Sequence, residues 1–404
     1  MTDSAHDIAI IGAGIVGLST AMECSRRHPG GRMIVLEKEQ SVGAHQSSHN
    51  SGVIHSGIYY KPGSLKARTC VAGAAAMLRF CREEGIPHEV CGKVIVAITE
   101  AELPALEELH RRGTANGVAR LEMLDSARLR ACEPHGRGIR ALHVPTAAIT
   151  DYAAVTRRYA EIAAASGVTI RTGARVTGIV RRAGETIIES TAGSHRARLV
   201  INCAGLHSDT IARMAGARTD AVIVPFRGEY YELRPASRSL VRGLIYPVPD
   251  PRFPFLGVHF TRRVDGTVEA GPNAVLALRR EGYRRSDIHP IDLLGTLGFP
   301  GFWKMSRRWW RTGVAEMRRS FSRGIFLRDL QRLVPDLRDE DLVPGGSGVR
   351  AQLLDRSGAL VDDFRIIRLE GMVHVLNVPS PAATASLIIG RHIADLADEM
   401  SVAA

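Results

Sequence analysis

The stretch DIAIIGAGIVGLSTAMECSRR, residues 7–27, predicts how the chain begins to fold. Its first apolar residues, 8–11, are mostly β-branched, as is typical of a strand buried inside a parallel sheet. Gly12, Gly14 and Gly17 follow in the pattern GxGxxG, and the remainder of the stretch has the spacing of a helix. This order predicts an anion site, because a helix N-terminus attracts negative charge and Gly14 lets a pyrophosphate approach the backbone.

A second apolar strand follows in MIVLEKE, residues 33–39, and it ends near Glu37. This acid lies 20 residues after Gly17, the distance at which a carboxylate binds the ribose hydroxyls of a dinucleotide. A carboxylate there disfavours the 2′-phosphate of NADP, so the pattern predicts FAD or NAD. The alternative is a βαβ unit whose glycines serve packing only, and the complete order of elements argues against it.

The composition is that of a globular protein with a basic surface. The chain has 404 residues, of which 45% are hydrophobic and 24% charged, enough for more than one small domain. Its 53 Lys and Arg against 42 Asp and Glu give a formal charge of +11. This excess favours anionic small molecules, anionic lipid or nucleic acid as partners. No nucleic-acid-binding motif accompanies the charge, so we expect no nucleic acid partner.

The cysteines and the apolar runs indicate the cellular compartment of the protein. Six cysteines are scattered singly with no CxxC pair, which predicts reduced thiols and no metal site. No signal peptide is recognisable before the first strand, and no apolar run has the length of a membrane span. We therefore expect a cytoplasmic protein.

Elements of the nucleotide-binding type come from three separate parts of the chain. A helix at 151–167, a strand and helix at 197–216 and a strand–loop–helix tail continue the pattern that the N-terminus begins. A dedicated NAD dehydrogenase usually keeps its nucleotide domain contiguous, so the interleaving favours a flavoprotein. The predicted division is 1–85, 151–216 and 344–404 for the nucleotide-binding domain, and 86–150 and 217–343 for a substrate-binding domain.

Seven motifs spread over the chain resemble those of one flavoprotein group. They are HNSGVIHSGIYYKPGSLKA (49–67), INCAGLHSD (201–209), PFRGEYYEL (225–233), PFLGVHFTRRVDG (254–266), GPNAVLA (271–277), GVRAQLLDRSGALVDDF (348–364) and NVPSPAATASLIIG (377–390). The chain resembles the FAD-dependent oxidoreductases of the D-amino-acid oxidase, sarcosine oxidase and glycerol-3-phosphate oxidase group. Within that group it resembles the L-2-hydroxyglutarate oxidases and dehydrogenases nearly end to end. The resemblance implies an α/β fold, a GR2-type Rossmann-like FAD-binding domain with an inserted substrate domain whose antiparallel sheet covers the isoalloxazine.

The small residues at 47–52 are expected to run along FAD from the ribose to the ring, and those after Pro381 to hold its pyrimidine end. The structural alternatives are an ordinary strand–helix junction after Pro381 and a packed strand end at Cys203. The expected cofactor contacts are Gly12, Gly14, Ile15, Val16, Gly17, Glu37, Lys38, Ser47, Ser48, His49, Asn50, Ser51, Gly52, Val176, Cys203, Ala204, Gly205, Gly348, Val349, Pro381, Ala382, Ala383 and Thr384.

Two histidines are candidates for the base that oxidation of a 2-hydroxy acid requires. His259 lies in FLGVHFT, and the resemblance places this strand over the flavin. His55 stands where sarcosine oxidase carries a substrate-facing arginine. We expect His259 to be the base and His55 to be a substrate-binding or second acid–base group. For each, the alternative is a structural or surface histidine.

A dicarboxylate substrate requires cations, and bidentate pairing favours arginine. The candidates inside the family motifs are Arg227, Arg350 and Lys61, with Tyr60 and Tyr246 as hydroxyl donors. Outside such motifs a basic residue is normally a solvated surface group. Which cation would bind which carboxylate stays open.

The attachment of FAD and the surface of one helix complete the expectations. A covalent flavin link is not indicated, because no cysteine follows Cys203, although a histidyl link through His45 or His49 stays open. Residues 301–321 have Phe302, Met305, Trp309, Val314, Met317 and Phe321 near helical spacing, interleaved with basic residues. Such a helix can lie on the inner face of the cell membrane and deliver electrons to quinone. The residues favour the alternative, a helix packed on the substrate domain with a solvated basic face.

The leading functional hypothesis is oxidation of L-2-hydroxyglutarate to 2-oxoglutarate, with hydride passing to flavin N5 and then electrons to oxygen or a membrane quinone. The alternatives are oxidation of another 2-hydroxy acid, or of an amino acid or secondary amine. A flavoprotein that has lost catalysis, or one that binds nucleic acid, has less support in the residues.

Overall fold

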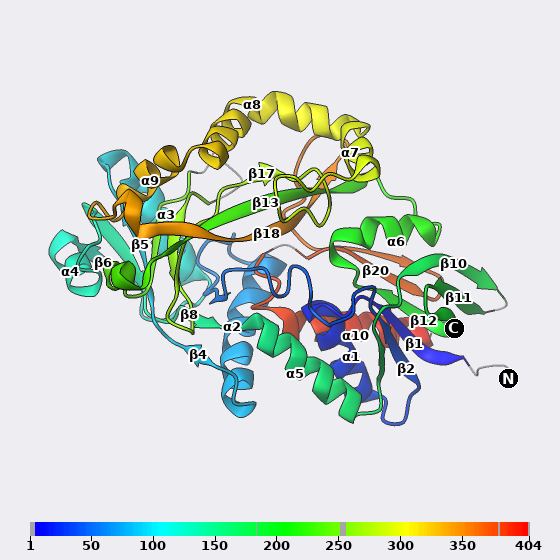
Figure 1. Ribbon diagram of the computed structural model, residues 1–404. Coiled ribbons are helices and arrows are strands. Elements are labelled where there is room, and N and C mark those ends of the chain that lie inside the picture. The colour runs from blue at the N-terminus through cyan, green and yellow to red at the C-terminus, as the bar shows by residue number, and fades with distance from the viewer. Residues whose placement is uncertain (1–4, 183, 251–255, 379, 403–404) are drawn as a thin grey trace.

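Two large β-sheets organise the chain in the computed structural model, which describes residues 5–182, 184–250, 256–378 and 380–402 (Figure 1). The strands of the first sheet are β1 (His6–Ile11), β2 (Met33–Leu36), β9 (Thr169–Arg171), β10 (Val176–Arg182), β11 (Glu185–Ser190), β12 (Gly193–Asn202), β19 (Arg365–Leu369) and β20 (Met372–Asn377). β1 lies between β2 and β12, and both pairings are parallel. β20 also pairs in parallel with β12, while β10 and β11 extend the sheet as an antiparallel hairpin.

Helices α1 (Ile15–Arg27), α2 (Leu65–Glu83), α5 (Tyr152–Ala165) and α10 (Ser386–Val402) pack on one face of this sheet (Figure 1). The opposite face packs against α6 (Ser208–Met214) and the β10–β11 hairpin. α1 and α10 approach each other closely at Gly390, where an added Cβ would lie 2.5 Å from Ser19 Oγ. The absence of a side chain at Gly390 permits this approach. Ser19 also donates a hydrogen bond of 2.7 Å to the carbonyl of Ser386. The first and last parts of the chain therefore form one layer.

The second sheet is largely antiparallel. Its strands are β5 (Lys93–Ala97), β6 (Glu122–Asp125), β7 (Arg140–Val144), β13 (Ala221–Leu233), β14 (Leu244–Pro247), β15 (His259–Arg262), β16 (Val268–Gly271), β17 (Val275–Leu276) and β18 (Leu342–Asp355). β13 and β18 pair from Ala221 opposite Asp355 to Leu233 opposite Leu342. The helices on this half are α3 (Leu103–Ala115), α4 (Ser126–Cys132), α7 (Pro290–Leu297), α8 (Pro300–Phe321) and α9 (Arg323–Gln331). A small sheet of β3 (Val53–Ile54), β8 (Ala148–Thr150) and β4 (His88–Glu89) adds strands from both halves.

The two large sheets draw on alternating stretches of the chain, and the strand β18 differs from the predicted division. β18 belongs to the second sheet, although the sequence places residues 344–404 with the nucleotide-binding domain. The reason is its long antiparallel pairing with β13, which continues to Asp355. Pro254 and Phe255 of one family motif and Pro379 of another lie outside the described residues.

Candidate active site

A cavity of about 1740 Å³ lies between the two large sheets and exceeds the roughly 300–1,000 Å³ of most small-molecule sites. One side is lined by the carboxyl ends of β1, β2, β12 and β20, and the other by β13, β14, β15 and β18. Ligands of open α/β sheets bind at the carboxyl ends of the strands. The cavity therefore has a nucleotide-type wall and a second wall of sheet side chains.

The glycine turn after β1 depends on the absence of side chains. Gly12 has a φ of 104°, and a Cβ there would lie 2.6 Å from the carbonyl oxygen of Cys203. A Cβ at Gly17 would lie 2.0 Å from the carbonyl oxygen of Gly12, so Gly17 lets α1 pack against the turn. Gly14 precedes α1 and contributes no capping side chain, while Gly14, Ile15 and Val16 line the cavity. A helix N-terminus that opens into a cavity suits an anion such as a pyrophosphate.

Glu37 and Ser47 shape the same wall. Glu37 accepts hydrogen bonds from the backbone N–H groups of Ala13 (2.8 Å) and Glu39 (2.9 Å). Its carboxylate is buried and lines the cavity, and its remaining lone pairs can accept from the hydroxyls of a ribose. Ser47 Oγ accepts from the N–H of Ile15 at 2.9 Å, which brings the loop over the start of α1. These residues fit a bound dinucleotide.

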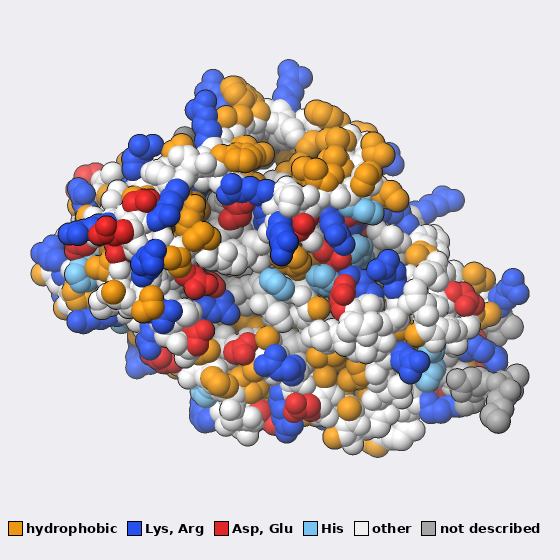
Figure 2. Space-filling model, in the orientation of Figure 1, with side chains coloured by type: hydrophobic (Ala, Val, Ile, Leu, Met, Phe, Trp, Pro, Cys, Tyr) orange, Lys and Arg blue, Asp and Glu red, His pale blue; other side chains and the backbone are white. Residues whose placement is uncertain are grey.

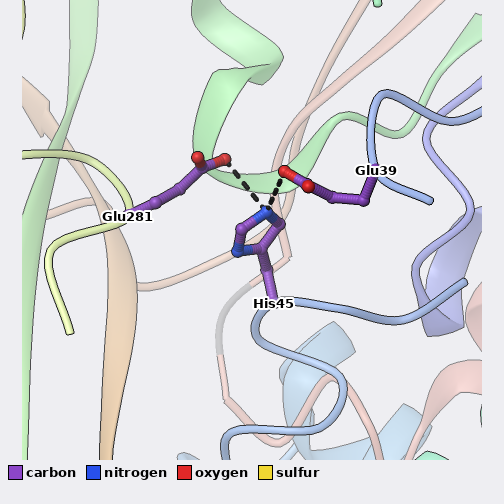
Figure 3. A group of neighbouring side chains, drawn as sticks. All are labelled: Glu39, His45 and Glu281. Atoms are coloured by element: carbon purple, nitrogen blue, oxygen red, sulfur yellow. Dashed lines mark hydrogen bonds and ion pairs between the residues drawn. The ribbon is translucent and has the colours of Figure 1, made fainter. Parts of the chain in front are cut away.

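A cluster of ionisable side chains lies at this end of the cavity, which Lys38, His45 and Glu281 line. Figure 3 shows Glu39, His45 and Glu281 of this cluster pointing toward one another. His45 Nε2 lies 2.9 Å from Glu39 Oε1 and 3.2 Å from Glu281 Oε1. The three groups have the spacing of metal ligands, but the Lys38 ammonium pairs with both carboxylates and so neutralises them. Burial raises the pKa of Glu281, yet hydrogen bonds from His207 and Lys38 outweigh it and lower that pKa well below its usual range. The cluster is therefore an ion-pair network that fastens the Glu281 loop over the nucleotide end.

The loop before α10 fixes His55 at another part of the cavity. Pro381, Ala382, Ala383 and Thr384 line the cavity, and Thr384 Oγ1 accepts from the backbone N–H of His55 at 3.1 Å. Nδ1 of His55 is buried and has no hydrogen-bond partner among the described residues. Burial, with smaller contributions from nearby Lys93 and His259, lowers the pKa of His55 to about 3. Its imidazole is therefore neutral near pH 7.

His259 lies on β15 and lines the same cavity. Its Nδ1 lies 2.8 Å from the carbonyl oxygen of Gly257, and because a carbonyl only accepts, Nδ1 carries the proton and Nε2 keeps its lone pair. Burial lowers the pKa of His259 to about 3, and the charges of Arg350 and Lys93 act in the same direction. The ring centroid of Tyr246 lies 3.9 Å from that of His259. The arrangement presents a neutral imidazole with an available lone pair.

Only some of the predicted substrate-binding cations line the cavity. Arg350 lines the cavity from β18, and its guanidinium donates to the carbonyl of Asn273 at 3.4 Å. Arg227 is not among the lining residues, because strand alternation turns Gly228 and Tyr230 toward the cavity and Arg227 away.

The buried Arg227 guanidinium pairs with Glu229 at 3.1 Å instead. Lys61 is exposed and also lies outside the lining. Lys66 lines the cavity in its place, ion-paired with Asp362 at 2.7 Å and 4.8 Å from the ring centroid of Tyr60.

Most of the expected cofactor contacts meet in this one cavity. Gly17, Ser48 and Gly52 do not line it and instead shape its backbone: Ser48 bonds to Gly43, and a Cβ at Gly52 would lie 2.7 Å from the carbonyl of Thr150. The predicted residues that line it are Gly12, Gly14, Ile15, Val16, Glu37, Lys38, Ser47, His49, Asn50, Ser51, His55, Tyr60, Val176, Cys203, Ala204, Gly205, Tyr246, His259, Gly348, Val349, Arg350, Pro381, Ala382, Ala383 and Thr384.

The part of the cavity that contains His55 and His259 is called the reaction end below. Several residues of the reaction end were not predicted from the sequence. Tyr59 and Tyr230 line the cavity, and the buried Lys93 reaches the ring faces of Tyr59 and Tyr246. A signal for Lys93 existed, because it shares one strand face with Ile95 and Ala97, where a lysine is unusual.

The architecture and its nucleotide end define a class, the FAD-dependent oxidoreductases. A family model described as FAD dependent oxidoreductase (DAO) matches residues 7–396. Among solved structures, the FAD-bound L-alpha-glycerophosphate oxidase of Mycoplasma pneumoniae superposes with a TM-score of 0.81 at 23% identity, covering 98% of this chain and 95% of that chain. Glycine oxidase from Geobacillus kaustophilus superposes with a TM-score of 0.70 at 18% identity, covering 98% and 95%.

Curated relatives narrow the class. L-2-hydroxyglutarate dehydrogenase of Indibacter alkaliphilus is 48% identical over 96% of this chain and 98% of its own. The mitochondrial L-2-hydroxyglutarate dehydrogenase of Homo sapiens is 44% identical over 97% and 88%, and that of Escherichia coli K12 is 43% identical over 96% and 92%. The chain belongs to the L-2-hydroxyglutarate dehydrogenase family within the FAD-dependent oxidoreductases.

Proposed function

We propose that the protein oxidises L-2-hydroxyglutarate to 2-oxoglutarate with FAD bound along the nucleotide wall of the cavity. The observation that carries the proposal is His259, a neutral imidazole whose Nε2 lone pair is available beside Arg350 and the buried Tyr246. The near full-length similarity to curated L-2-hydroxyglutarate dehydrogenases supports the choice of substrate.

The residues divide the chemistry between them. Oxidation of a 2-hydroxy acid removes the hydroxyl proton and a hydride from the same carbon. FAD, when bound, supplies the hydride acceptor. His259 Nε2 takes the hydroxyl proton, while Arg350 and Lys66 attract the carboxylates, and His55 serves as a hydrogen-bonding or second acid–base group.

The function is tested with purified protein loaded with FAD. Anaerobic addition of L-2-hydroxyglutarate should bleach the visible absorbance of the oxidised flavin, and the D-enantiomer should not. Bleaching by an amino acid or a secondary amine in its place would overturn the substrate assignment.

FAD is held without a covalent bond in this proposal. Cys203 lines the cavity, but burial raises the pKa of its thiol to about 12, so it stays protonated and unreactive. His45 is engaged with Glu39 and Tyr283, which leaves His49 as the alternative attachment point. Acid precipitation should release all flavin into the supernatant, and flavin that stays with the protein would contradict non-covalent binding.

A second proposal concerns the acceptor of the electrons, for which a membrane quinone is favoured by the surface of α7 and α8. The predicted apolar face is divided, since Phe302 and Met305 pack inside against β13 and β18. α8 has non-helical angles at Trp309, so its faces before and after that residue do not continue each other. On α7, α8 and the residues just before α7, the large apolar side chains that are exposed are Ile288, Ile291, Leu294, Trp303, Trp310, Val314, Met317 and Phe321.

This exposed face carries cations as well. Arg308 and Arg311 lie 5.3 Å and 5.4 Å from the ring centroids of Trp309 and Trp310. Figure 2 shows hydrophobic and basic side chains gathered over α7 and α8. Among the described helices, none combines the length and the apolar character that crossing a bilayer requires. Apolar side chains ringed by arginine suit a peripheral contact with anionic lipid on the inner face of the cell membrane.

Vesicle flotation tests this contact. The protein should float with vesicles that contain anionic lipid, and Trp303→Ser with Trp310→Ser should abolish flotation. Val90→Ser with Val180→Ser is the matched control, because both valines are exposed elsewhere. Oxygen as acceptor gains support if the double tryptophan variant floats like the parent and reoxidises equally fast in air.

A further inference from the structure

Lys93 is a buried cation that no acid among the described residues neutralises. It begins β5, is 2% exposed and shares the inward strand face of Ile95 and Ala97, both fully buried. Its Nζ has no hydrogen-bond partner in the part of the chain that the structure describes. A buried charge is normally paired, so an unpaired one indicates a group that is completed by something that binds.

Two aromatic rings separate Lys93 from the cavity. Its Nζ lies 4.6 Å from the ring centroid of Tyr59 and 5.0 Å from that of Tyr246, and both tyrosines line the cavity. The ring faces partly stabilise the ammonium, because their quadrupoles present negative charge to it. Tyr59 OH is itself buried, and no described residue is its hydrogen-bond partner. The ammonium, the rings and the hydroxyl thus form one incompletely satisfied group behind the pocket.

The choice of lysine at this position is informative. The chain has only five lysines against 48 arginines, so arginine is the usual cation of this sequence. A guanidinium has five N–H donors to satisfy, whereas an ammonium is compact and fits between two rings. The space between the two rings therefore favours the compact ammonium group of lysine over the larger guanidinium group of arginine.

The charge of Lys93 also acts on the two histidines. It helps to lower the pKa of His55 and of His259, in both cases after burial. Burial lowers the pKa of Lys93 itself to about 8, so it is largely charged near pH 7. The remaining ionisable neighbour, Cys70, stays a thiol because burial raises its pKa to about 12. Lys93 is thus charged beside the neutral side chains of His55, His259 and Cys70, and Arg350 is a second charge that acts on His259.

We propose that Lys93 is a positioning residue that makes the pocket prefer a doubly negative substrate, through its unpaired ammonium beneath the rings of Tyr59 and Tyr246. The inference rests on the proposed function for the identity of the dianion. A dicarboxylate in the pocket supplies the negative charge that no described residue supplies. A monocarboxylate needs only one cation, for which Arg350 is already present, whereas the charge of Lys66 is already paired with Asp362.

The test compares Lys93→Met and Lys93→Arg with Ile95→Val, a mild change on the same strand face. In Lys93→Met the KM for L-2-hydroxyglutarate should rise about tenfold or more. The KM for L-2-hydroxyvalerate, its monocarboxylate counterpart, should change less than about twofold. The Tm should stay equal or rise, because methionine removes an unpaired buried charge. Ile95→Val should leave the ratio of the two KM values unchanged.

The pH dependence gives the same test without a substitution. Lys93 loses its charge as the pH rises through about 8, so glutarate binding to the unmodified protein, followed by thermal shift, should weaken above that pH. Valerate binding should not weaken in step with it. Lys93→Met should lack this alkaline decline in glutarate binding.

The outcomes separate this inference from the proposed function. If the parent oxidises L-2-hydroxyglutarate and Lys93→Met keeps the parental KM ratio with a lowered Tm, Lys93 is structural and the inference is overturned. If the parent does not oxidise L-2-hydroxyglutarate but binds glutarate in a Lys93-dependent manner, the function fails and the inference stands. If the parent binds glutarate no better than valerate, the inference fails whatever the substrate.

Discussion

His259 holds its Nδ1 2.8 Å from the carbonyl oxygen of Gly257, only two residues away, and this contact decides which ring nitrogen can act as a base. Because the carbonyl accepts the Nδ1 proton, Nε2 is the acceptor. Nδ1 of His55, in the same cavity, has no partner among the described residues, so neither tautomer is imposed on it there. Both histidines are neutral at physiological pH, and a contact with a carbonyl fixes the tautomer of His259 alone among these two, which is why we propose His259 as the base.

Replacing His259, the proposed base, should therefore slow the chemical step. In His259→Gln, the rate of flavin reduction by L-2-hydroxyglutarate should fall by roughly 10²–10⁴-fold, the range for loss of a general base. FAD content should stay at the parental level. Stopped-flow reduction under anaerobic conditions measures the rate, with His135→Gln as control because His135 pairs with Asp336 near the surface. Reduction at the parental rate would mean that His259 is not the base.

The same burial predicts acid sensitivity of the fold. The pKa of His259 is about 3 in the native protein and about 6.5 when unfolded, so below pH 6.5 the unfolded chain binds a proton that the native protein does not. The contribution of His259 to the free energy of unfolding is therefore fully present above pH 6.5, and it decreases as the pH falls toward 3. His259→Phe should reduce this slope by up to about 1.4 kcal/mol per pH unit.

Urea unfolding at several pH values in this window measures the slope. Part of it should remain in the variant, since burial also lowers the pKa of His55 and brings that of His374 to about 4. A variant slope equal to that of the parent would indicate that His259 is already protonated in the native protein.

The glycine turn should be intolerant of a side chain. Gly12→Ala adds a Cβ within 2.6 Å of the Cys203 carbonyl oxygen at a positive φ, which moves β1 against β12 at the nucleotide wall. We expect loss of most bound FAD and a destabilisation of at least about 2 kcal/mol. Flavin absorbance per protein and Tm measure both effects. Gly30→Ala is the control, because Gly30 also has a positive φ but no atom within 4 Å of an added Cβ, and equal FAD loss in both variants would attribute the effect to φ alone.

The nucleotide end could be predicted from sequence because its chemistry is local. The turn at Gly12, the helix start at Gly14 and the acid at Glu37 follow from spacing within one βαβ unit. The family motifs then pointed to His259, whose place on a strand facing the cavity the structure gives directly.

The reaction end depends on pairings between distant strands, which spacing does not reveal. Arg227 and Arg350 both lie in family motifs, but Arg227 falls on the far face of β13 while Arg350 falls on the cavity face of β18. Lys93 acquires its meaning only when β5 and β14 bring it beneath Tyr246. The kink at Trp309 likewise changes which side chains of α8 reach solvent. Each difference comes from register or backbone geometry rather than from residue type.

The ion-pair network over the nucleotide end predicts slower release of FAD than an open site would allow. Glu281 joins Lys38 (2.6 Å), His207 (2.9 Å) and His45 (3.2 Å), so its carboxylate ties the loop to the nucleotide-binding half, beside a second ion pair between Arg280 and Asp209. Glu281→Gln removes that charge while keeping the shape. The FAD dissociation rate should rise roughly tenfold, the effect of losing about 1.4 kcal/mol.

Salt distinguishes this network from simple packing. Raising the ionic strength screens the partly exposed pairs, so the parental dissociation rate should increase with salt while that of Glu281→Gln changes little. Transfer of FAD to an excess of the apo form of another FAD-binding protein, followed by flavin fluorescence, measures the rate. Glu185→Gln is the matched control, since Glu185 pairs with Arg196 on the β10–β11 side of the molecule. Equal salt dependence in Glu281→Gln and the parent would show that the Glu281 loop does not retain the cofactor.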